Sequence, residues 1–193
     1  MKKPGITLIE LLITITLMGS LLIAISSLYL IGFRTYTEEL ASSMVQSNAQ
    51  TIMDAVILDA KNGMLIPETY HSDTTGKDYT TDVNMVIIRI PAINASNQIL
   101  YSGTDELYDT VIYYYSNNEI HKVTYADLPS ARHSKDGLDT VLDKQILSLN
   151  FVYDPVDPGA AHLVKVTISS DIMVGNRNKE ITITGEARMR NHI

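Results

Sequence analysis

An apolar run from Ile6 to Phe33 constrains the fold of this chain more than any other feature. Glu10 is the only charged side chain inside the run. A helix needs about 20 predominantly apolar residues to cross the hydrocarbon core of a bilayer, so this run is long enough. Lys2 and Lys3 come just before it and predict that its start lies on the cytoplasmic side. We therefore expect one membrane-spanning helix over residues 6–33.

Glu10 is the exception that a membrane-spanning helix has to explain. A charged side chain at the centre of a bilayer costs about 2.5–3.5 kcal/mol or more, so Glu10 is a candidate functional residue. A secretory signal peptide is one alternative, but its apolar region has roughly 7–15 residues and ends at a small-residue cleavage site. Here the run is longer, and no Ala-x-Ala pattern closes it. A plain signal anchor explains the length and the lysines but leaves Glu10 without a role.

The N-terminal pattern reads Lys2-Lys3-Pro4-Gly5, then Ile6-Thr7-Leu8-Ile9-Glu10, then the apolar run. This pattern resembles the N-terminus of the type IV prepilin family, which usually has Phe where this chain has Ile6. The resemblance implies that a prepilin peptidase removes residues 1–5 as a leader by cleaving between Gly5 and Ile6, and that it N-methylates Ile6. It also implies that Glu10, which becomes the fifth residue of the mature chain, serves assembly with other pilins or pseudopilins.

The helical pattern continues beyond the apolar run. Apolar residues recur after Arg34 at the spacing of one helical face, and charged residues occupy the other face. Asn62-Gly63 predicts the end of the helix. We expect one helix from about Ile6 to Lys61, whose amphipathic half over residues 34–62 packs on a globular domain. The face expected to be buried contains Leu40, Met44, Val45, Ile52, Met53, Val56, Ile57 and Met64, together with Ala41, Ala49 and Ala60.

Residues 63–193 are expected to form an antiparallel β-sheet domain. The segment 63–82 is polar and rich in turn residues, which predicts a loop. Turns are expected at Ser116–Asn118 and Gly175–Asn178. The predicted fold class is therefore α+β, with the long N-terminal helix packed on the sheet. Alternating and β-branched residues predict strands at 83–90, 108–115, 119–125, 140–142, 146–153, 163–172 and 180–189.

This layout again resembles a pilin. More narrowly, it is similar to the minor pilins and pseudopilins that include the type II secretion pseudopilin J and PilW-type proteins. The residues that carry the similarity are the hairpin from Tyr113-Tyr114-Tyr115 to Ile120, the segment Leu149–Tyr153, and Arg188-Met189-Arg190-Asn191.

The composition argues against several kinds of chemistry. A net charge of −7 gives no support to direct nucleic-acid binding, and the absence of cysteine excludes disulfides and thiol chemistry. Asp154–Gly159 offers oxygen atoms for Ca²⁺ but lacks the alternation of a calcium loop and reads as a turn. We expect no cofactor, no metal and no enzymatic activity. The five histidines, which lack metal-ligand spacing, are His71, His121, His133, His162 and His192.

These features together predict a minor pilin or pseudopilin. We expect it in the cytoplasmic membrane, with its C-terminal domain outside the cytoplasm, before it enters a pilus-like or type II secretion filament. One alternative is a competence pseudopilin that serves DNA uptake, and another is a signal-anchored extracytoplasmic binding protein or enzyme. The pairing of Glu10 also stays open, because it could bind the N-terminal amine of a neighbouring chain or that of its own chain.

Overall fold

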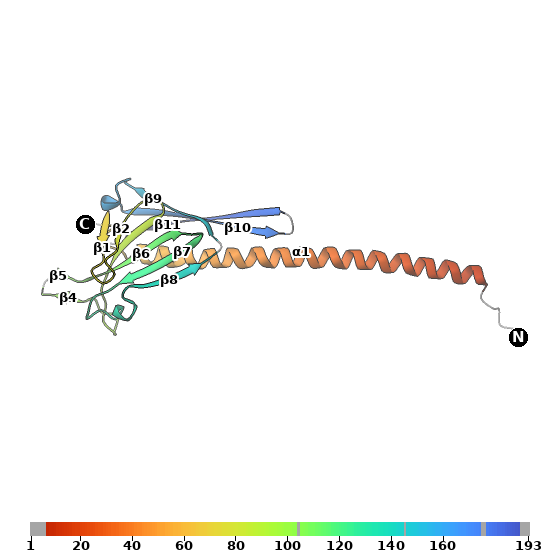
Figure 1. The fold of residues 1–193 in the computed structure, drawn as a ribbon, viewed down its shortest axis with the longest axis horizontal. Helices are drawn as coiled ribbons and strands as arrows, with labels where there is room; N and C mark the ends of the chain where they lie inside the picture. Colours follow the sequence, from red (N-terminus) through yellow and green to blue (C-terminus); the bar gives the residue numbers. More distant parts are fainter. Residues whose placement is uncertain (1–6, 104, 145, 175–176, 190–193) are drawn as a thin grey trace. The chain divides into compact units, whose positions relative to one another are not determined.

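The computed structural model describes residues 7–103, 105–144, 146–174 and 177–189. One long helix, α1 (Leu8–Asn62), precedes a series of antiparallel strands, so the predicted α+β class is confirmed (Figure 1). The helix ends at Asn62, directly before Gly63, as the sequence predicts. The chain divides into two compact units, Met1–Ser43 and Met44–Ile193.

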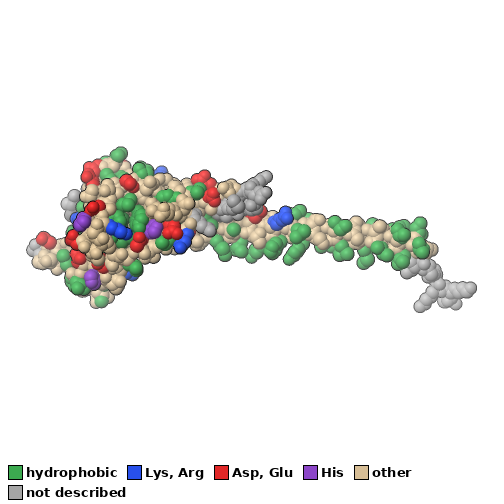
Figure 2. Space-filling model, viewed as in Figure 1, with side chains coloured by type: hydrophobic (Ala, Val, Ile, Leu, Met, Phe, Trp, Pro, Cys, Tyr) green, Lys and Arg blue, Asp and Glu red, His purple; other side chains and the backbone are tan. Residues whose placement is uncertain are grey.

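The described part of the first unit is helical from Leu8 onward and strongly apolar. The large apolar side chains between Leu8 and Phe33 are each more than half exposed, and Figure 2 shows hydrophobic side chains along this part of the helix. By length and composition, α1 can cross a membrane. A helix with apolar side chains all round is stable when lipid or other apolar helices surround it.

In the second unit, the last turns of α1 supply one side of the core. The side chains of Ala49, Ile52, Met53, Val56 and Ala60 are buried, and their spacing is that of a single helical face. From Ala49 to Ala60, the predicted buried face is therefore confirmed for these five residues, while Ile57 and Met64 are only half-buried.

Met44, at the start of the same unit, is 59% exposed. The prediction that this residue is buried is wrong, because the core begins only at Ala49.

The larger sheet has four strands in the order β3-β6-β7-β8, all antiparallel. The predicted hairpin at Ser116–Asn118 is confirmed, and Asn117 and Asn118 have positive φ values of 53° and 63°. These values suit the tight turns that join antiparallel strands. One face of the sheet contributes to the core that contains the end of α1. The strands are β3 (Met85–Pro91), β6 (Tyr108–Ser116), β7 (Glu119–Tyr125) and β8 (Leu138–Asp143).

The second sheet has the order β11-β10-β9 and completes the core around α1. The Phe151 N–H of β9 donates a hydrogen bond of 2.7 Å to the carbonyl of Val83, which connects this sheet to the chain just before β3. A Cβ placed on Gly185 of β11 would lie 2.8 Å from the sulfur of Met53 and would also meet Ile57. Gly185 therefore allows α1 to approach β11 closely. The strands are β9 (Ile146–Asp154), β10 (Leu163–Val174) and β11 (Arg177–Arg188).

The predicted loop over residues 63–82 is wrong in part. It contains a small hairpin of β1 (Thr69–His71) and β2 (Asp78–Thr80), in which Tyr70 pairs with Tyr79. Tyr79 is buried on the second face of the four-stranded sheet, where its hydroxyl lies 2.8 Å from that of Tyr125. Strands of three residues are too short to show an alternating pattern, so tertiary contact with the sheet determines them.

Several element boundaries also differ from the prediction. The strand expected at 140–142 runs from Leu138 to Asp143. Arg177 and Asn178 belong to β11 and not to the expected turn, while Gly175 and Asn176 of that turn lie outside the described residues. Pairing with β10 extends β11 toward this turn. The remaining short elements are β4 (Tyr101–Ser102), β5 (Asp105–Glu106), η1 (His133–Lys135) and η2 (Pro158–Ala160).

Candidate functional site

The residues predicted for processing lie outside the part of the chain that the structure describes. These are Lys2, Lys3, Gly5 and Ile6. Cleavage between Gly5 and Ile6 therefore stays a prediction from the sequence. The first predicted site residue that the structure places is Glu10, in the first turn of α1.

Glu10 forms a capping box with Thr7. The Oε2 atom of Glu10 accepts hydrogen bonds of 3.1 Å from both the N–H and the hydroxyl of Thr7. In return, the Glu10 N–H donates to the Thr7 hydroxyl oxygen at 3.3 Å. This reciprocal arrangement satisfies backbone donors that a helix N-terminus otherwise leaves unpaired. The Oε1 atom of Glu10 accepts no hydrogen bond from any residue described, so half of the carboxylate remains available.

Four other polar side chains of the apolar segment are satisfied within the helix. The hydroxyls of Thr14, Thr16, Ser20 and Ser27 each donate to a backbone carbonyl three or four residues earlier, at 2.7 to 2.9 Å. A hydroxyl bonded in this way adds little cost in lipid, because its donor is already paired. Glu10 therefore differs from these residues in both its charge and its unpaired oxygen.

Two further sequence features concern metal binding. Within the described residues, no group of three or more His, Cys, Asp or Glu side chains is placed to hold a metal ion. Asp157 of the Asp154–Gly159 turn caps η2, where its Oδ1 accepts a hydrogen bond of 3.0 Å from the N–H of Gly159. His192 lies outside the described residues.

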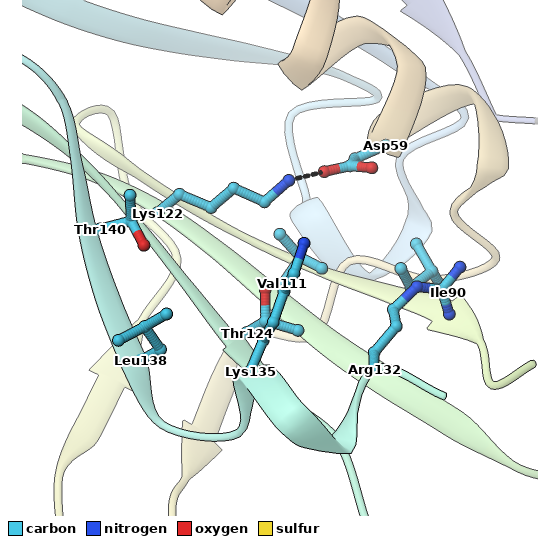
Figure 3. Close-up of a pocket in the computed structure, with 9 residues that line it drawn as sticks. All are labelled: Asp59, Ile90, Val111, Lys122, Thr124, Arg132, Lys135, Leu138 and Thr140. Atoms are coloured by element: carbon cyan, nitrogen blue, oxygen red, sulfur yellow. Dashed lines mark hydrogen bonds and ion pairs between the residues drawn. The ribbon is translucent and has the colours of Figure 1, made fainter. Parts of the chain in front are cut away.

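The sequence did not predict a cavity in the second unit, on the face of the four-stranded sheet that packs against α1. Its volume is about 290 Å³. Asp59 of α1, strands β3, β6, β7 and β8, and the η1 region line it (Figure 3). Three cationic side chains, Lys122, Arg132 and Lys135, extend toward this cavity (Figure 3).

Asp59 accepts hydrogen bonds from two side chains at one end of the cavity. One oxygen of its carboxylate, Oδ2, accepts hydrogen bonds of 2.7 Å from the ammonium of Lys122 and 2.6 Å from the phenol of Tyr113. The Lys122 ammonium also lies 5.1 Å from the centroid of the Tyr113 ring, a distance at which a cation interacts with the ring face. Burial, and then the charge and hydrogen bond of Asp59, raise the pKa of the Tyr113 phenol above its ordinary value.

A second ion pair lies beside the cavity. The Nη1 atom of Arg132 donates hydrogen bonds of 2.7 Å to Oδ2 of Asp109 and 2.9 Å to the carbonyl of Pro91. Ser130 donates to the same Asp109 oxygen at 2.8 Å. The Asp109 side chain is 1% exposed, so its charge depends on these partners.

Lys135 is the cation of the cavity that has no counter-ion among the described residues. It is exposed, and its ammonium forms no ion pair with any carboxylate of the described residues. The sequence carried no signal for this cavity, because Asp59 of α1 and Lys122 of β7 are far apart along the chain, and both belong to other elements than Arg132 and Lys135 of the η1 region. Only the antiparallel order of β6, β7 and β8 under α1 brings them together.

Comparisons with known proteins did not identify a relative of this chain. No protein-family model matches the chain, and neither does any curated protein or solved structure that was compared with it.

Proposed function

We propose that this chain is a minor pilin or pseudopilin, a non-enzymatic subunit of a type IV pilus-like or type II secretion filament. The single observation that carries the proposal is the first turn of α1. There, one carboxylate is the only charge in a segment that is otherwise apolar, and one of its oxygens has no partner among the described residues. A group that lipid cannot solvate needs a reason to be in that position.

A complementary charge on a neighbouring subunit would supply that reason. Cleavage after Gly5 would create a positively charged amine on Ile6, and the helix N-terminus adds partial positive charge nearby. The Oε1 atom of Glu10 could then accept a hydrogen bond from the amine of the next chain while Oε2 keeps its bonds to Thr7. Such a pair sets the depth at which two helices meet, so it provides specificity in assembly.

The second unit is consistent with a role in contacts outside the membrane. Its sheets bury the last turns of α1 in a core that contains no disulfide, since the chain has no cysteine. In the proposed function, this unit meets neighbouring subunits or cargo, and α1 anchors the chain in the cytoplasmic membrane before assembly. The prepilin peptidase and other pilins or pseudopilins are the partners that the proposal requires.

Mass spectrometry of the mature N-terminus tests the proposal. We expect the chain purified from cells that contain a prepilin peptidase to begin at N-methylated Ile6. The same chain from cells without the peptidase should begin at Met1, as should the Gly5→Arg variant in either host. A wild-type chain that still begins at Met1 in the presence of the peptidase would contradict the proposal.

A further inference from the structure

The cavity beside Asp59 carries positive charge in a protein that is acidic as a whole. The chain has a net charge of −7, yet three of the charged side chains that line the cavity are cations and only Asp59 is an anion. Asp109, which lies beside the cavity, forms an ion pair with Arg132. Counting Asp109 together with the charged lining residues gives three cations and two carboxylates, a net charge of +1. Because Asp59 pairs with Lys122, the unmatched charge belongs to Lys135.

The cationic groups have hydrogen-bond donors to spare. A lysine ammonium has three donors, and that of Lys135 forms no ion pair with the described residues. The hydrogen bonds of Arg132 to described residues leave from Nη1, so Nη2 and Nε retain N–H groups for another acceptor. A guanidinium and an ammonium that face one cavity suit an oxyanion, because charge-assisted hydrogen bonds are stronger than neutral ones.

The remaining lining of the cavity is mixed, with the apolar side chains of Ile90, Val111 and Leu138 and the hydroxyl side chains of Thr124 and Thr140. Ile90 and Val111 are 3% and 2% exposed, and Leu138 is 56% exposed at the edge strand β8. Ile90 and Val111 are therefore already almost fully shielded, and Leu138 is the apolar side chain that a ligand without a hydrocarbon group would leave in contact with water. The volume of about 290 Å³ is just below the range for small-molecule sites, roughly 300–1,000 Å³, so the matching ligand is small.

We propose that this cavity binds a small organic monoanion, a carboxylate on a short branched hydrocarbon group. The carboxylate accepts hydrogen bonds from Lys135 and Arg132, and the hydrocarbon group packs chiefly on Leu138, next to the small exposed parts of Ile90 and Val111. A single negative charge balances the single unmatched positive charge, which favours a carboxylate over a phosphate dianion. This site goes beyond the proposed filament function and does not depend on it.

Methyl NMR of the full chain in detergent micelles provides the test, with labelled Ile, Val and Leu methyl groups. Isovalerate is the probe, and isovaleramide is a control of the same shape without charge. We expect isovalerate to shift the methyl resonances of Ile90, Val111 and Leu138 in a saturable way, and isovaleramide to leave them unchanged. Equal shifts with the two compounds would overturn the proposal.

Variants of Lys135 test whether this side chain binds the carboxylate of isovalerate. We expect Lys135→Gln to weaken isovalerate binding by about tenfold, the effect of losing one charge-assisted hydrogen bond, and Lys135→Arg to restore most of it. Lys165→Gln removes an exposed charge from β10, in the other sheet, and should leave the affinity unchanged. The spectrum without ligand reports whether each variant is folded.

Inorganic phosphate separates the roles of charge and hydrocarbon. We expect phosphate to bind more weakly than isovalerate, since it makes no use of the apolar side chains of the cavity. Phosphate binding tighter than that of isovalerate would overturn the organic-monoanion assignment. Unchanged isovalerate affinity in folded Lys135→Gln would overturn the role of Lys135.

Discussion

The carboxylate of Asp59 on α1 accepts a hydrogen bond of 2.6 Å from the phenol of Tyr113 on β6, which joins the end of the helix to a central strand of the sheet. The Tyr113 side chain is fully buried, so its hydroxyl has no access to bulk water as an alternative partner. The same carboxylate oxygen holds Lys122. This bond therefore links the packing of α1 to the charge arrangement of the cavity.

Removing the Tyr113 hydroxyl should destabilise the second unit moderately. We expect Tyr113→Phe to lower the free energy of unfolding by about 1–3 kcal/mol, because the ring remains but a hydrogen bond to a charged group is lost. Tyr101→Phe is the matched control, since Tyr101 is 55% exposed, and its effect should stay within about 0.5 kcal/mol. Urea unfolding in detergent, followed by tyrosine fluorescence, measures both. Equal stabilities of the two variants would show that the bond contributes nothing.

Aspartate substitutions on two sides of α1 test which face of the helix lies in the core. Ile52 is 5% exposed, so we expect Ile52→Asp to lower the free energy of unfolding by roughly 3–5 kcal/mol through an unpaired buried charge. Leu58→Asp places the same charge on a side chain that is 59% exposed, near the helix C-terminus, and should cost about 1 kcal/mol or less. The same urea experiment compares them. An unchanged stability in Ile52→Asp would show that this face is not buried.

The close approach of α1 to β11 predicts an unusual effect of substituting a strand glycine. Glycine normally weakens a strand, so a β-branched residue at position 185 would stabilise the protein if space were available. Instead, we expect Gly185→Val to cost about 1–3 kcal/mol, because its Cβ would overlap Met53 and Ile57. Thr184→Val adds a similar side chain on the exposed face of β11 and should change stability by less than about 0.5 kcal/mol. A stabilised Gly185→Val variant would contradict this packing.

The contact between His71 and Asp78 should make the stability of the β1–β2 hairpin depend on pH. Their Nδ1 and Oδ1 atoms lie 2.6 Å apart, and the hydrogen bond to Asp78, followed by its charge, raises the pKa of His71 above its ordinary value. The protonated form is thus favoured in the folded state. Its contribution to stability is complete below the unfolded-state pKa of about 6.5 and disappears as the pH rises through the higher folded-state pKa.

An NMR titration of the His71 ring checks this expectation. Asp78→Asn should return the pKa of His71 toward its ordinary value. Asp73→Asn should have a smaller effect, since the Asp73 carboxylate lies 3.7 Å from the other ring nitrogen and contributes less to the shift. A His71 pKa that is the same in the wild type and in Asp78→Asn would refute the assigned cause.

Glu10 caps the helix, and the proposed function also gives its charge a part in assembly, so substitutions can distinguish the two. Glu10→Gln keeps an acceptor for the Thr7 cap but removes the charge. We expect its incorporation into filaments to fall by roughly five- to thirtyfold, the effect of losing a pair that contributes about 1–2 kcal/mol in lipid. Glu10→Val should behave similarly, and Glu10→Asp should be intermediate because its side chain is shorter. Membrane insertion and cleavage should be unaffected.

Thr7→Val is the matched control for Glu10, because it removes the two hydrogen bonds of the Thr7 hydroxyl from the cap and retains the charge. We expect this variant to enter filaments nearly as well as the wild type. The measurement is the fraction of tagged protein in sheared filaments relative to the membrane pool. If Glu10→Gln assembles normally and Thr7→Val does not, then Glu10 acts as a helix cap and not as an assembly charge.

The amino-acid sequence was sufficient to predict the elements whose patterns are long. The apolar run and the helical spacing from Ala49 to Ala60 predicted α1, and Asn62-Gly63 marked its end. Alternating β-branched residues predicted the long strands. These patterns are readable because each element must present a continuous apolar face, and its period shows in consecutive residues.

Features that depend on residues far apart in the chain arise only when the chain packs into its tertiary structure. The three-residue strands β1 and β2 exist because Tyr79 packs against Tyr125, more than forty residues away. Asp59 and Lys135 likewise line one cavity only after α1 packs on the sheet. Charge pairing and cavity shape arise from distances between separate elements. A linear sequence does not contain these distances, because packing establishes them only when the sheets close around the end of the helix.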